Sequence, residues 1–274
     1  MSKPIFYVHI KGQGVRGEVR LNDAPVLELF LEYPQDAFPT ISEWVIDGEN
    51  LLSVHVRASD ESARLDISLC MAEFGDEPDP DTQVPIARIQ WPPPGTPTSA
   101  EGDGDEQGAV LPPPSIPPVL SAAGVASHPW GEWNWQRAPA FEGDAATVNA
   151  VTAWVRDLHA YLAAGRIDAL SGHSSVKFEE VAPLYEMTAA EARERLEGAW
   201  EYFQAQSGWE LAPFDEGDLD LRVRCGGRLV EPCTRDGLPI LRQRRPTEDG
   251  LWSLPIFLAR TNWGVVAGQL TIVR

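Results

Sequence analysis

The sequence predicts an α+β protein with two folded modules joined by a linker. Three observations support this prediction. Residues 1–91 consist of short β-prone runs, residues 92–129 are rich in proline and acidic side chains, and residues 130–274 place two amphipathic helices before alternating strands. A chain of 274 residues is long enough for one large or two ordinary domains. The change of composition at residue 92 favours two domains.

The first module, residues 1–91, is predicted to be an all-β domain. Its β-branched and aromatic residues occur in short runs separated by Gly, Asn, Asp and Pro, which favour turns. The runs are residues 5–10, 14–21, 26–31, 41–46, 51–57, 64–71 and 84–91. Short strands with regular turn signals are typical of a β-sandwich.

One turn of this module carries a recognisable pattern, at residues 44–56. Its apolar and turn residues are Trp44, Val45, Ile46, Gly48, Asn50, Leu51, Leu52, Val54 and Val56. This pattern resembles a strand, turn and strand of the jelly-roll sandwich domains that accompany many bacterial glycosidases. The resemblance implies a structural segment whose Trp and Leu side chains face the core, and it names no ligand.

Residues 92–129 are predicted to be a linker. The segment contains ten prolines and an acidic cluster at Glu101, Asp103, Asp105 and Glu106. It has too little apolar surface to offset the entropy of ordering it, and its prolines keep it extended. The alternative is that the apolar, Pro-rich residues 111–120 dock in a groove of one module or of a partner.

The second module, residues 130–274, begins with helix signals. Residues 147–164 carry an apolar stripe at helical spacing, and Gly165 is placed to end that helix. A second helix begins at Thr188, which forms a capping box with Glu191. Helices with one apolar face need a sheet or other helices to cover.

Shorter elements follow these helices in the prediction. Between the helices we expect a helical turn at residues 167–170, a short strand at 174–178 and a connector up to residue 185. From residue 219 onward, apolar and charged side chains alternate, as in antiparallel strands with one buried face. Glycines at 226 and 227 indicate a hairpin turn.

This order of elements resembles the nuclear-transport-factor-2-like (SnoaL-like) family over residues 146–274. Local patterns that carry the resemblance are residues 165–170 and a last strand that ends Leu270, Ile272, Val273, Arg274. The resemblance implies helices packed on a curved antiparallel sheet, which together form a cone. The family includes isomerases, cyclases, dehydratases, scaffolds and non-catalytic binding proteins, so it does not select one function.

Catalytic members of that family use an Asp or Glu base and a Tyr, His or Asp that holds a substrate oxygen. The resemblance makes Asp168 and His173 the candidates for such a pair. His159, Tyr185 and Asp220 are further candidates. No two of these residues have a diagnostic spacing, and neither HExxH nor GxSxG occurs. The sequence therefore favours a protein without catalysis, with a small-molecule isomerase, cyclase or dehydratase as the alternative.

The net charge of −19 limits the partners that we expect. An acidic surface repels phosphate backbones, so the sequence predicts no direct nucleic-acid binding and favours a basic protein partner. The alternative is that the acidity only maintains solubility.

Cys70, Cys225 and Cys233 have neither CxxC nor His/Cys ligand spacing. We therefore expect buried thiols in a reducing compartment, with no disulfide framework, metal or cofactor. Residues 1–10 lack a basic segment followed by a long apolar run, and no stretch is long enough to span a membrane. These features predict a cytoplasmic protein without a membrane partner.

A bacterial immunity protein that neutralises a cytoplasm-acting toxin fits these predictions. A toxin that attacks nucleic acid needs a positive site, which an acidic inhibitor can occupy. We expect partner contact at two acidic stretches, with solvated loops as the alternative for both. Their residues are Asp215, Glu216, Asp218 and Asp220 before the sheet, and Asp76, Glu77, Asp79 and Asp81 in the first module.

Overall fold

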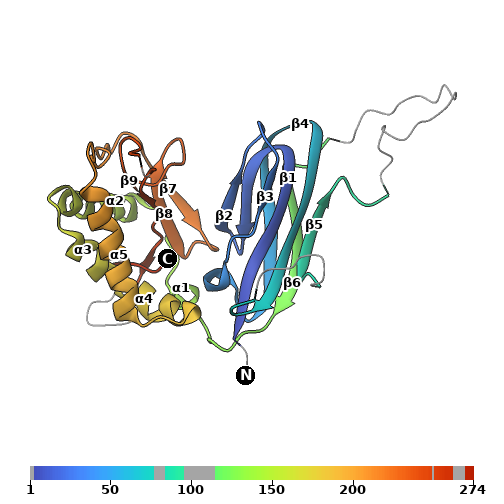
Figure 1. Ribbon diagram of the computed structural model, residues 1–274, viewed down its shortest axis with the longest axis horizontal. Helices are drawn as coiled ribbons and strands as arrows, with labels where there is room; N and C mark the ends of the chain where they lie inside the picture. Colours follow the sequence, from blue (N-terminus) through green and yellow to red (C-terminus); the bar gives the residue numbers. More distant parts are fainter. Residues whose placement is uncertain (1–2, 77–83, 96–114, 249, 262–268) are drawn as a thin grey trace. The chain divides into compact units, whose positions relative to one another are not determined.

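The computed structural model describes residues 3–76, 84–95, 115–248, 250–261 and 269–274 (Figure 1). The chain folds into two compact units, Met1–Gly131 and Glu132–Arg274. Unit 1 contains antiparallel strands, whereas unit 2 combines helices with antiparallel strands. The mixed α+β class is therefore confirmed. No helix within the described residues is both long enough and apolar enough to cross a membrane.

Unit 1 is built around two long paired strands. β1 (Pro4–Leu21) and β4 (Gly48–Glu73) pair antiparallel from Pro4 opposite Glu73 to Leu21 opposite Leu52. β2 and β3 pair with β1, and β5 and β6 pair with β4, which gives a six-stranded sheet. The bounds of these four strands are Ala24–Leu29, Gln35–Ala37, Ala87–Trp91 and Val119–Ala126.

The register of β1 against β4 shifts at Gly14. Gln13 pairs with Arg64, whereas Val15 pairs with Ser59. Gly14 has a φ of 62°, and a Cβ atom there would lie 2.4 Å from the Oδ1 atom of Asp60, so only glycine fits. The shift divides the sheet into one half with β3 and β5 and another with β2 and β6.

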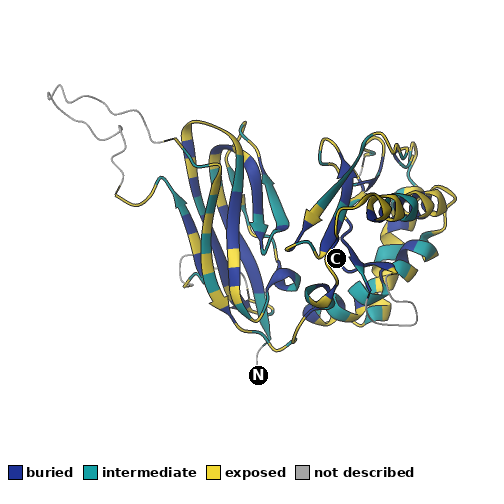
Figure 2. Ribbon diagram, turned by 180° about the vertical axis from the view of Figure 1, so that it is seen from behind, coloured by how far each residue is buried: buried dark blue, intermediate teal, exposed yellow. Residues whose placement is uncertain are grey.

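The two halves contact each other. A Cβ atom on Gly12 of β1 would lie 3.4 Å from the Leu29 side chain, which belongs to the other half. Gly124 of β6 lies so close to the chain before β5 that its Cβ would be 2.0 Å from the carbonyl oxygen of Ile86. Buried and exposed positions alternate along much of these strands (Figure 2). The fully buried apolar side chains of β1 and β4 include Val8, Ile10, Val19, Leu52, Val54, Ile67 and Leu69.

Three of the predicted strand assignments are wrong in unit 1. The runs 51–57 and 64–71 form the single strand β4. The runs 5–10 and 14–21 form the single strand β1, because the shift at Gly14 keeps the pairing with β4 continuous. Residues 41–46 contain the 3-10 helix η1 (Ser42–Trp44) instead of a strand. The Ser42 Oγ atom accepts a hydrogen bond from the Phe6 N–H at 2.8 Å, which holds this turn against β1 and buries Trp44.

The predicted linker, residues 92–129, is too long at its C-terminal end. Residues 119–126 form β6, which pairs with β4 from Gly48 opposite Ala126 to His55 opposite Val119. This strand was not predicted from the sequence, because Ser121, Ala122, Ala123 and Gly124 have weak β propensity. The glycine is nevertheless required by the close approach of Ile86. The acidic cluster at 101–106 lies outside the described residues.

Unit 2 contains both of the predicted long helices. α2 (Ala145–Ala163) starts at Asp144, whose side chain accepts a hydrogen bond from the Thr147 N–H at 2.8 Å. α5 (Ala189–Gln204) starts with the expected capping box between Thr188 and Glu191. The other helices are α1 (Asn134–Arg137), α3 (Ile167–His173), α4 (Ser175–Val181) and η2 (Ala182–Tyr185).

The short strand predicted at residues 174–178 is wrong, because this segment belongs to α4. The Phe178 N–H donates to the Ser174 carbonyl at 3.0 Å, which is a helical bond. Val176 and Phe178 alternate with polar residues in the sequence, but helical packing places Phe178 in the interior. Tertiary packing has overridden a weak local pattern.

The sheet of unit 2 has the order β12-β11-β8-β7. The predicted hairpin is confirmed, since Gly226 and Gly227 have positive φ angles of 63° and 88° between β7 and β8. The four strands of this sheet are Leu219–Arg224 (β7), Leu229–Thr234 (β8), Leu258–Arg260 (β11) and Leu270–Ile272 (β12). A separate pair joins β9 (Leu241–Arg242) to β10 (Ser253–Leu254).

Three tryptophans fill the centre of unit 2. The ring centroids of Trp200, Trp209 and Trp252 lie 5.1 to 5.8 Å apart, in edge-to-face arrangements. Trp200 is almost fully buried, and Leu158 of α2 belongs to the same apolar cluster. Leu196 and Phe203 of α5 and Trp154 of α2 are partly buried against this cluster, so both long helices turn most of their apolar stripe toward the interior. Ala199 of α5 is exposed, contrary to the prediction.

Candidate functional site

An acidic turn before β7 holds three of the predicted contact residues together. The Asp218 N–H donates to the Asp215 carbonyl at 3.2 Å, and the Leu219 N–H donates to the Glu216 carbonyl at 3.3 Å. The Asp215 Oδ1 atom accepts from the Gly217 N–H at 2.8 Å. These bonds form a compact turn in which Asp215 and Glu216 are exposed. Asp215, Glu216 and Asp218 are called the acidic turn below.

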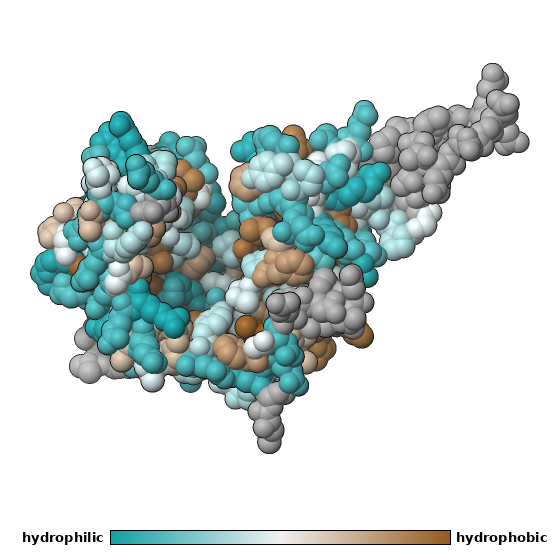
Figure 3. Space-filling view, in the orientation of Figure 1, coloured by the Kyte–Doolittle hydropathy of each residue, from teal (hydrophilic) through white to brown (hydrophobic). Residues whose placement is uncertain are grey.

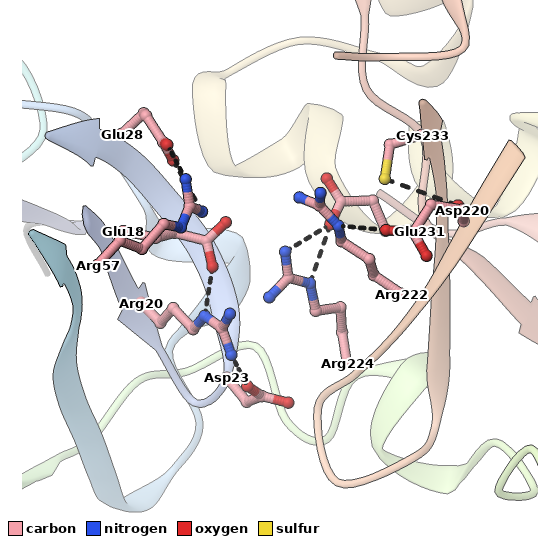
Figure 4. A network of polar contacts seen from close by, with 10 residues as sticks. All are labelled: Glu18, Arg20, Asp23, Glu28, Arg57, Asp220, Arg222, Arg224, Glu231 and Cys233. Carbon is pink, nitrogen blue, oxygen red and sulfur yellow. Dashed lines mark hydrogen bonds and ion pairs between the residues drawn. The ribbon is translucent and has the colours of Figure 1, made fainter. Parts of the chain in front are cut away.

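Two carboxylates of the predicted stretch already have arginine partners within the chain. The Arg156 Nε atom of α2 donates to Glu216 Oε1 at 2.6 Å. Arg222 Nε donates to Asp220 Oδ2 at 3.0 Å, and Figure 4 draws these two residues. Arg156 and Glu216 are about half exposed, so their ion pair contributes at most about 1 kcal/mol. Arg156 could not be predicted as a partner from the sequence, because it lies 60 positions before Glu216.

The second predicted stretch is only partly described. Asp76 is exposed after β4, and its N–H donates to the Glu73 carbonyl at 3.1 Å. Glu77, Asp79 and Asp81 lie outside the described residues.

The candidate catalytic residues occupy separate environments. The side chain of Asp168 is 68% exposed and forms an ion pair with Arg166 at 3.1 Å, and this hydrogen bond lowers the pKa of the carboxyl. The His173 ring packs edge-on against Trp154 at 4.9 Å, and burial lowers its pKa. No hydrogen bond or ion pair joins Asp168 to His173 in the part of the chain that the structure describes.

The other candidates do not complete a catalytic group. The buried His159 ring is hydrogen-bonded through Nε2 to the carbonyl of Ala212 at 2.7 Å, which fixes α2 to the segment before β7. Asp220 pairs with Arg222 as described above. Tyr185 alone lines a cavity.

This cavity lies in unit 2 between α4, η2, α5 and the ends of strands, and it has a volume of about 280 Å³. Its apolar lining consists of Phe178, Val181, Ala182, Met187, Ala192, Leu196, Leu254, Ile256 and Ile272. Ser174, Lys177, Tyr185 and Arg195 supply the polar groups. Neither Asp168 nor His173 lines it. No sequence motif indicated the cavity, because its walls come from residues that are almost 100 positions apart.

Unit 1 contains a more polar groove of about 560 Å³ across four strands. Lys11, Asp36, Arg64 and Asp66 are among its lining residues. Several of its charges are already engaged. Arg88 donates to both carboxylate oxygens of Asp66, at 2.8 and 2.6 Å, and the hydrogen bond lowers the pKa of that carboxyl.

Each unit also has a charged network, and Figure 4 draws both. In unit 1, Arg20 contacts Glu18 and also Asp23, the latter at 2.8 Å. In unit 2, Arg224 pairs with Glu231 at 2.8 Å. Burial raises the pKa of the neighbouring Cys233 thiol to about 12, so this thiol is a weak nucleophile.

The described residues contain no group of three His, Cys, Asp or Glu side chains placed to hold a metal ion. Cys70, Cys225 and Cys233 are buried and form no disulfide bond with one another.

Comparisons with protein-family models, with curated proteins and with solved structures found no match to this chain.

Proposed function

We propose that this chain is a non-catalytic binding protein whose partner is a basic protein. The observation that carries the proposal is the acidic turn, which presents Asp215, Glu216 and Asp218 from one short segment before β7. The surface of unit 2 in Figure 3 is mainly hydrophilic over its helices, as expected for a solvent-exposed, charged face. A partner with lysine or arginine side chains would complement this turn.

The distribution of ion pairs supports the same proposal. Many arginines of unit 2 are bound to carboxylates of the same unit, as in Arg156 with Glu216, Arg244 with Glu210, and Arg274 with Glu180. Because acidic residues outnumber basic ones in the sequence, this pairing leaves a surplus of carboxylates. The surplus produces a negative potential that attracts a basic partner over a distance of about 10 Å at 0.1 M salt.

The particular role that we propose is that of a bacterial immunity protein, which acts in the cytoplasm on a cognate toxin. A toxin that cleaves or modifies nucleic acid needs a cationic site, and exposed carboxylates can occupy it in place of phosphate. The weak pair between Arg156 and Glu216 supports this role, since an arginine of the toxin could replace Arg156 at little cost. Buried cysteines that form no disulfide bond suit a reducing compartment.

We also propose the finer fold assignments. The contacts between the two halves of the β1 and β4 ribbon support a jelly-roll type β-sandwich for unit 1. Long helices over an antiparallel sheet of order β12-β11-β8-β7 support a nuclear-transport-factor-2-like cone for unit 2. The described residues between α3 and α5 form no strand, whereas the predicted order of elements has a short strand there.

The proposal is tested by neutralising the acidic turn. A basic partner is first recovered by pull-down from the native host at low salt. Its association with the parent chain and with the variant Asp215→Asn, Glu216→Gln and Asp218→Asn is then measured at 50 and 300 mM salt. We expect association to slow at least tenfold at low salt and the difference to shrink at high salt.

A matched control separates the acidic turn from net charge alone. Glu186→Gln, Glu194→Gln and Glu201→Gln together remove the same three charges from exposed positions on or next to α5. This control should slow association much less. Equal slowing by both variants would mean that only the total charge matters, and tight binding that neither variant affects would refute the proposed surface.

An isomerase, cyclase or dehydratase is the second candidate function. The cavity beside Tyr185 favours it, because a hydroxyl next to an apolar space can orient a small substrate. The positions of Asp168 and His173 outside that lining argue against them as its catalytic pair. Turnover of a small molecule that is lost in Tyr185→Phe, with folding intact, would favour the enzyme over the binding protein.

A further inference from the structure

The cavity of unit 2 lies beside the N-terminal half of α5, whereas the tryptophan cluster fills the space nearer the C-terminal half. Ala192 and Leu196 of α5 form one wall, and Phe178 of α4 forms another. Ile256 and Ile272 close it on the strand side. Because these walls belong to one compact unit, the cavity is a feature of unit 2 alone.

The interior of this cavity is suited to hydrocarbon. A volume of about 280 Å³ would hold about nine water molecules at roughly 30 Å³ each. Most of the lining residues are apolar, so water in the cavity has few hydrogen-bond partners and an apolar chain can displace it. The volume is therefore large enough for a short aliphatic chain and too small for a lipid with two long chains.

The charged side chains that line the cavity are both basic. Lys177 of α4 and Arg195 of α5 both line it, and none of the described lining residues is acidic. On α5, Glu191 lies one turn before Arg195 and interacts with it electrostatically. The Glu191 carboxylate also accepts hydrogen bonds from the Thr188 N–H and Oγ1 at 2.7 and 2.9 Å, so the helix cap shares its charge. Two cations at an apolar space complement an anionic head group on a short chain.

We propose that this cavity binds an aliphatic monocarboxylate of about eight carbon atoms, with its chain among Phe178, Leu196 and Ile272 and its carboxylate at Lys177 and Arg195. The site is independent of the acidic turn and of the proposed protein partner. Binding would be noncovalent and would require no cofactor.

The proposal is tested first with matched ligands. Octanoate, 1-octanol and octylamine share one chain but carry a negative, a neutral and a positive head group, and each is titrated calorimetrically into the full-length chain at pH 7. We expect octanoate to bind at least tenfold more tightly than 1-octanol and octylamine not to bind measurably. From butanoate to octanoate, the Kd should fall about fourfold for each added methylene group.

Variants of the cavity then assign the site. Lys177→Gln combined with Arg195→Gln should weaken octanoate binding at least tenfold and leave 1-octanol binding unchanged. Arg193→Gln together with Arg235→Gln is the control, because it removes two charges from exposed residues that do not line the cavity. Ala192→Leu, at a partly exposed position, should fill the cavity and weaken both ligands, and circular dichroism checks its folding.

Three results would overturn the proposal. The first is the absence of octanoate binding to the full-length chain. The second is equal binding of octanoate and octylamine, which would exclude charge recognition at Lys177 and Arg195. The third is octanoate binding that is unaffected by both Ala192→Leu and the double cation variant, which would place the ligand elsewhere.

Discussion

Glu180 of α4 joins the last residue of the chain to the first helix of unit 2. Its Oε2 atom accepts a hydrogen bond from Arg274 Nη1 at 2.8 Å, and its Oε1 atom accepts from the Asn134 N–H at 2.6 Å. The Arg274 guanidinium also lies over the Trp133 ring, 5.0 Å from its centroid. A single carboxylate thus connects α1, α4 and the segment after β12.

We predict that Glu180→Gln destabilises the folded chain by about 3 kcal/mol or more. Arg274 is 2% exposed in its side chain, so removing the negative partner leaves a buried guanidinium without its counter-charge. Urea unfolding followed by circular dichroism measures this change. Glu179→Gln, at the exposed neighbouring position, should change the free energy of unfolding by less than about 0.5 kcal/mol. Equal stability of the two variants would contradict the importance of this ion pair.

A second prediction concerns the tryptophan cluster. Trp200→Ala should destabilise unit 2 by about 3–5 kcal/mol, because it empties a large, fully buried aromatic site. Fluorescence-monitored unfolding measures the loss. Tyr202→Ala serves as the control, since that ring is 54% exposed on the same helix. If Trp200→Ala unfolds at the parent's midpoint, the assigned inward face of α5 is wrong.

The sequence predicted the long helices of unit 2 because their signals are local. The capping residue Thr188 and the apolar residue Trp200 both belong to α5 and need no distant partner to be recognised. By contrast, β6 depends on pairing with β4, whose residues lie about 70 positions earlier, and its small side chains carry little propensity. Long-range pairing of this kind is not visible in one sequence.

The candidate sites also differ in whether their residues are adjacent in the sequence or meet only in the folded chain. Asp215, Glu216 and Asp218 were predicted together because they are adjacent in the sequence, but Arg156, which neutralises Glu216, was not. The cavity was missed because Ile272 and Phe178 meet only in the folded chain. Asp168 and His173 were selected through a family resemblance, and the structure gives each a separate local partner.

A third prediction follows from the lowered pKa of His173. Burial disfavours the protonated ring, so the unfolded chain binds a proton more readily than the folded chain below the ordinary pKa of about 6.5. The contribution of the neutral His173 ring to the stability of the folded chain is therefore present above that pH and is lost as the pH falls. We expect the His173→Gln variant to lose less stability than the parent between pH 7.5 and 5.5, with a difference of at most about 1.4 kcal/mol per pH unit.

The measurement is the urea midpoint of unit 2, followed by tryptophan fluorescence at several pH values. His159→Gln is a useful comparison, because it removes a different histidine from the same unit. If His173→Gln has the same pH dependence as the parent, the ring of His173 does not titrate differently in the folded chain.

The last prediction tests whether β6 belongs to the folded part of unit 1. In Gly124→Ala, the new Cβ atom would lie 2.0 Å from the carbonyl oxygen of Ile86, which is too close for any real contact. The backbone would have to move, and we expect a cost of about 1–3 kcal/mol and faster amide hydrogen exchange over residues 119–126. Ala123→Ser is the control, since Ala123 is exposed and adjacent. Fast exchange over 119–126 in the parent chain itself would show that this segment is unpaired in solution and would restore the longer linker.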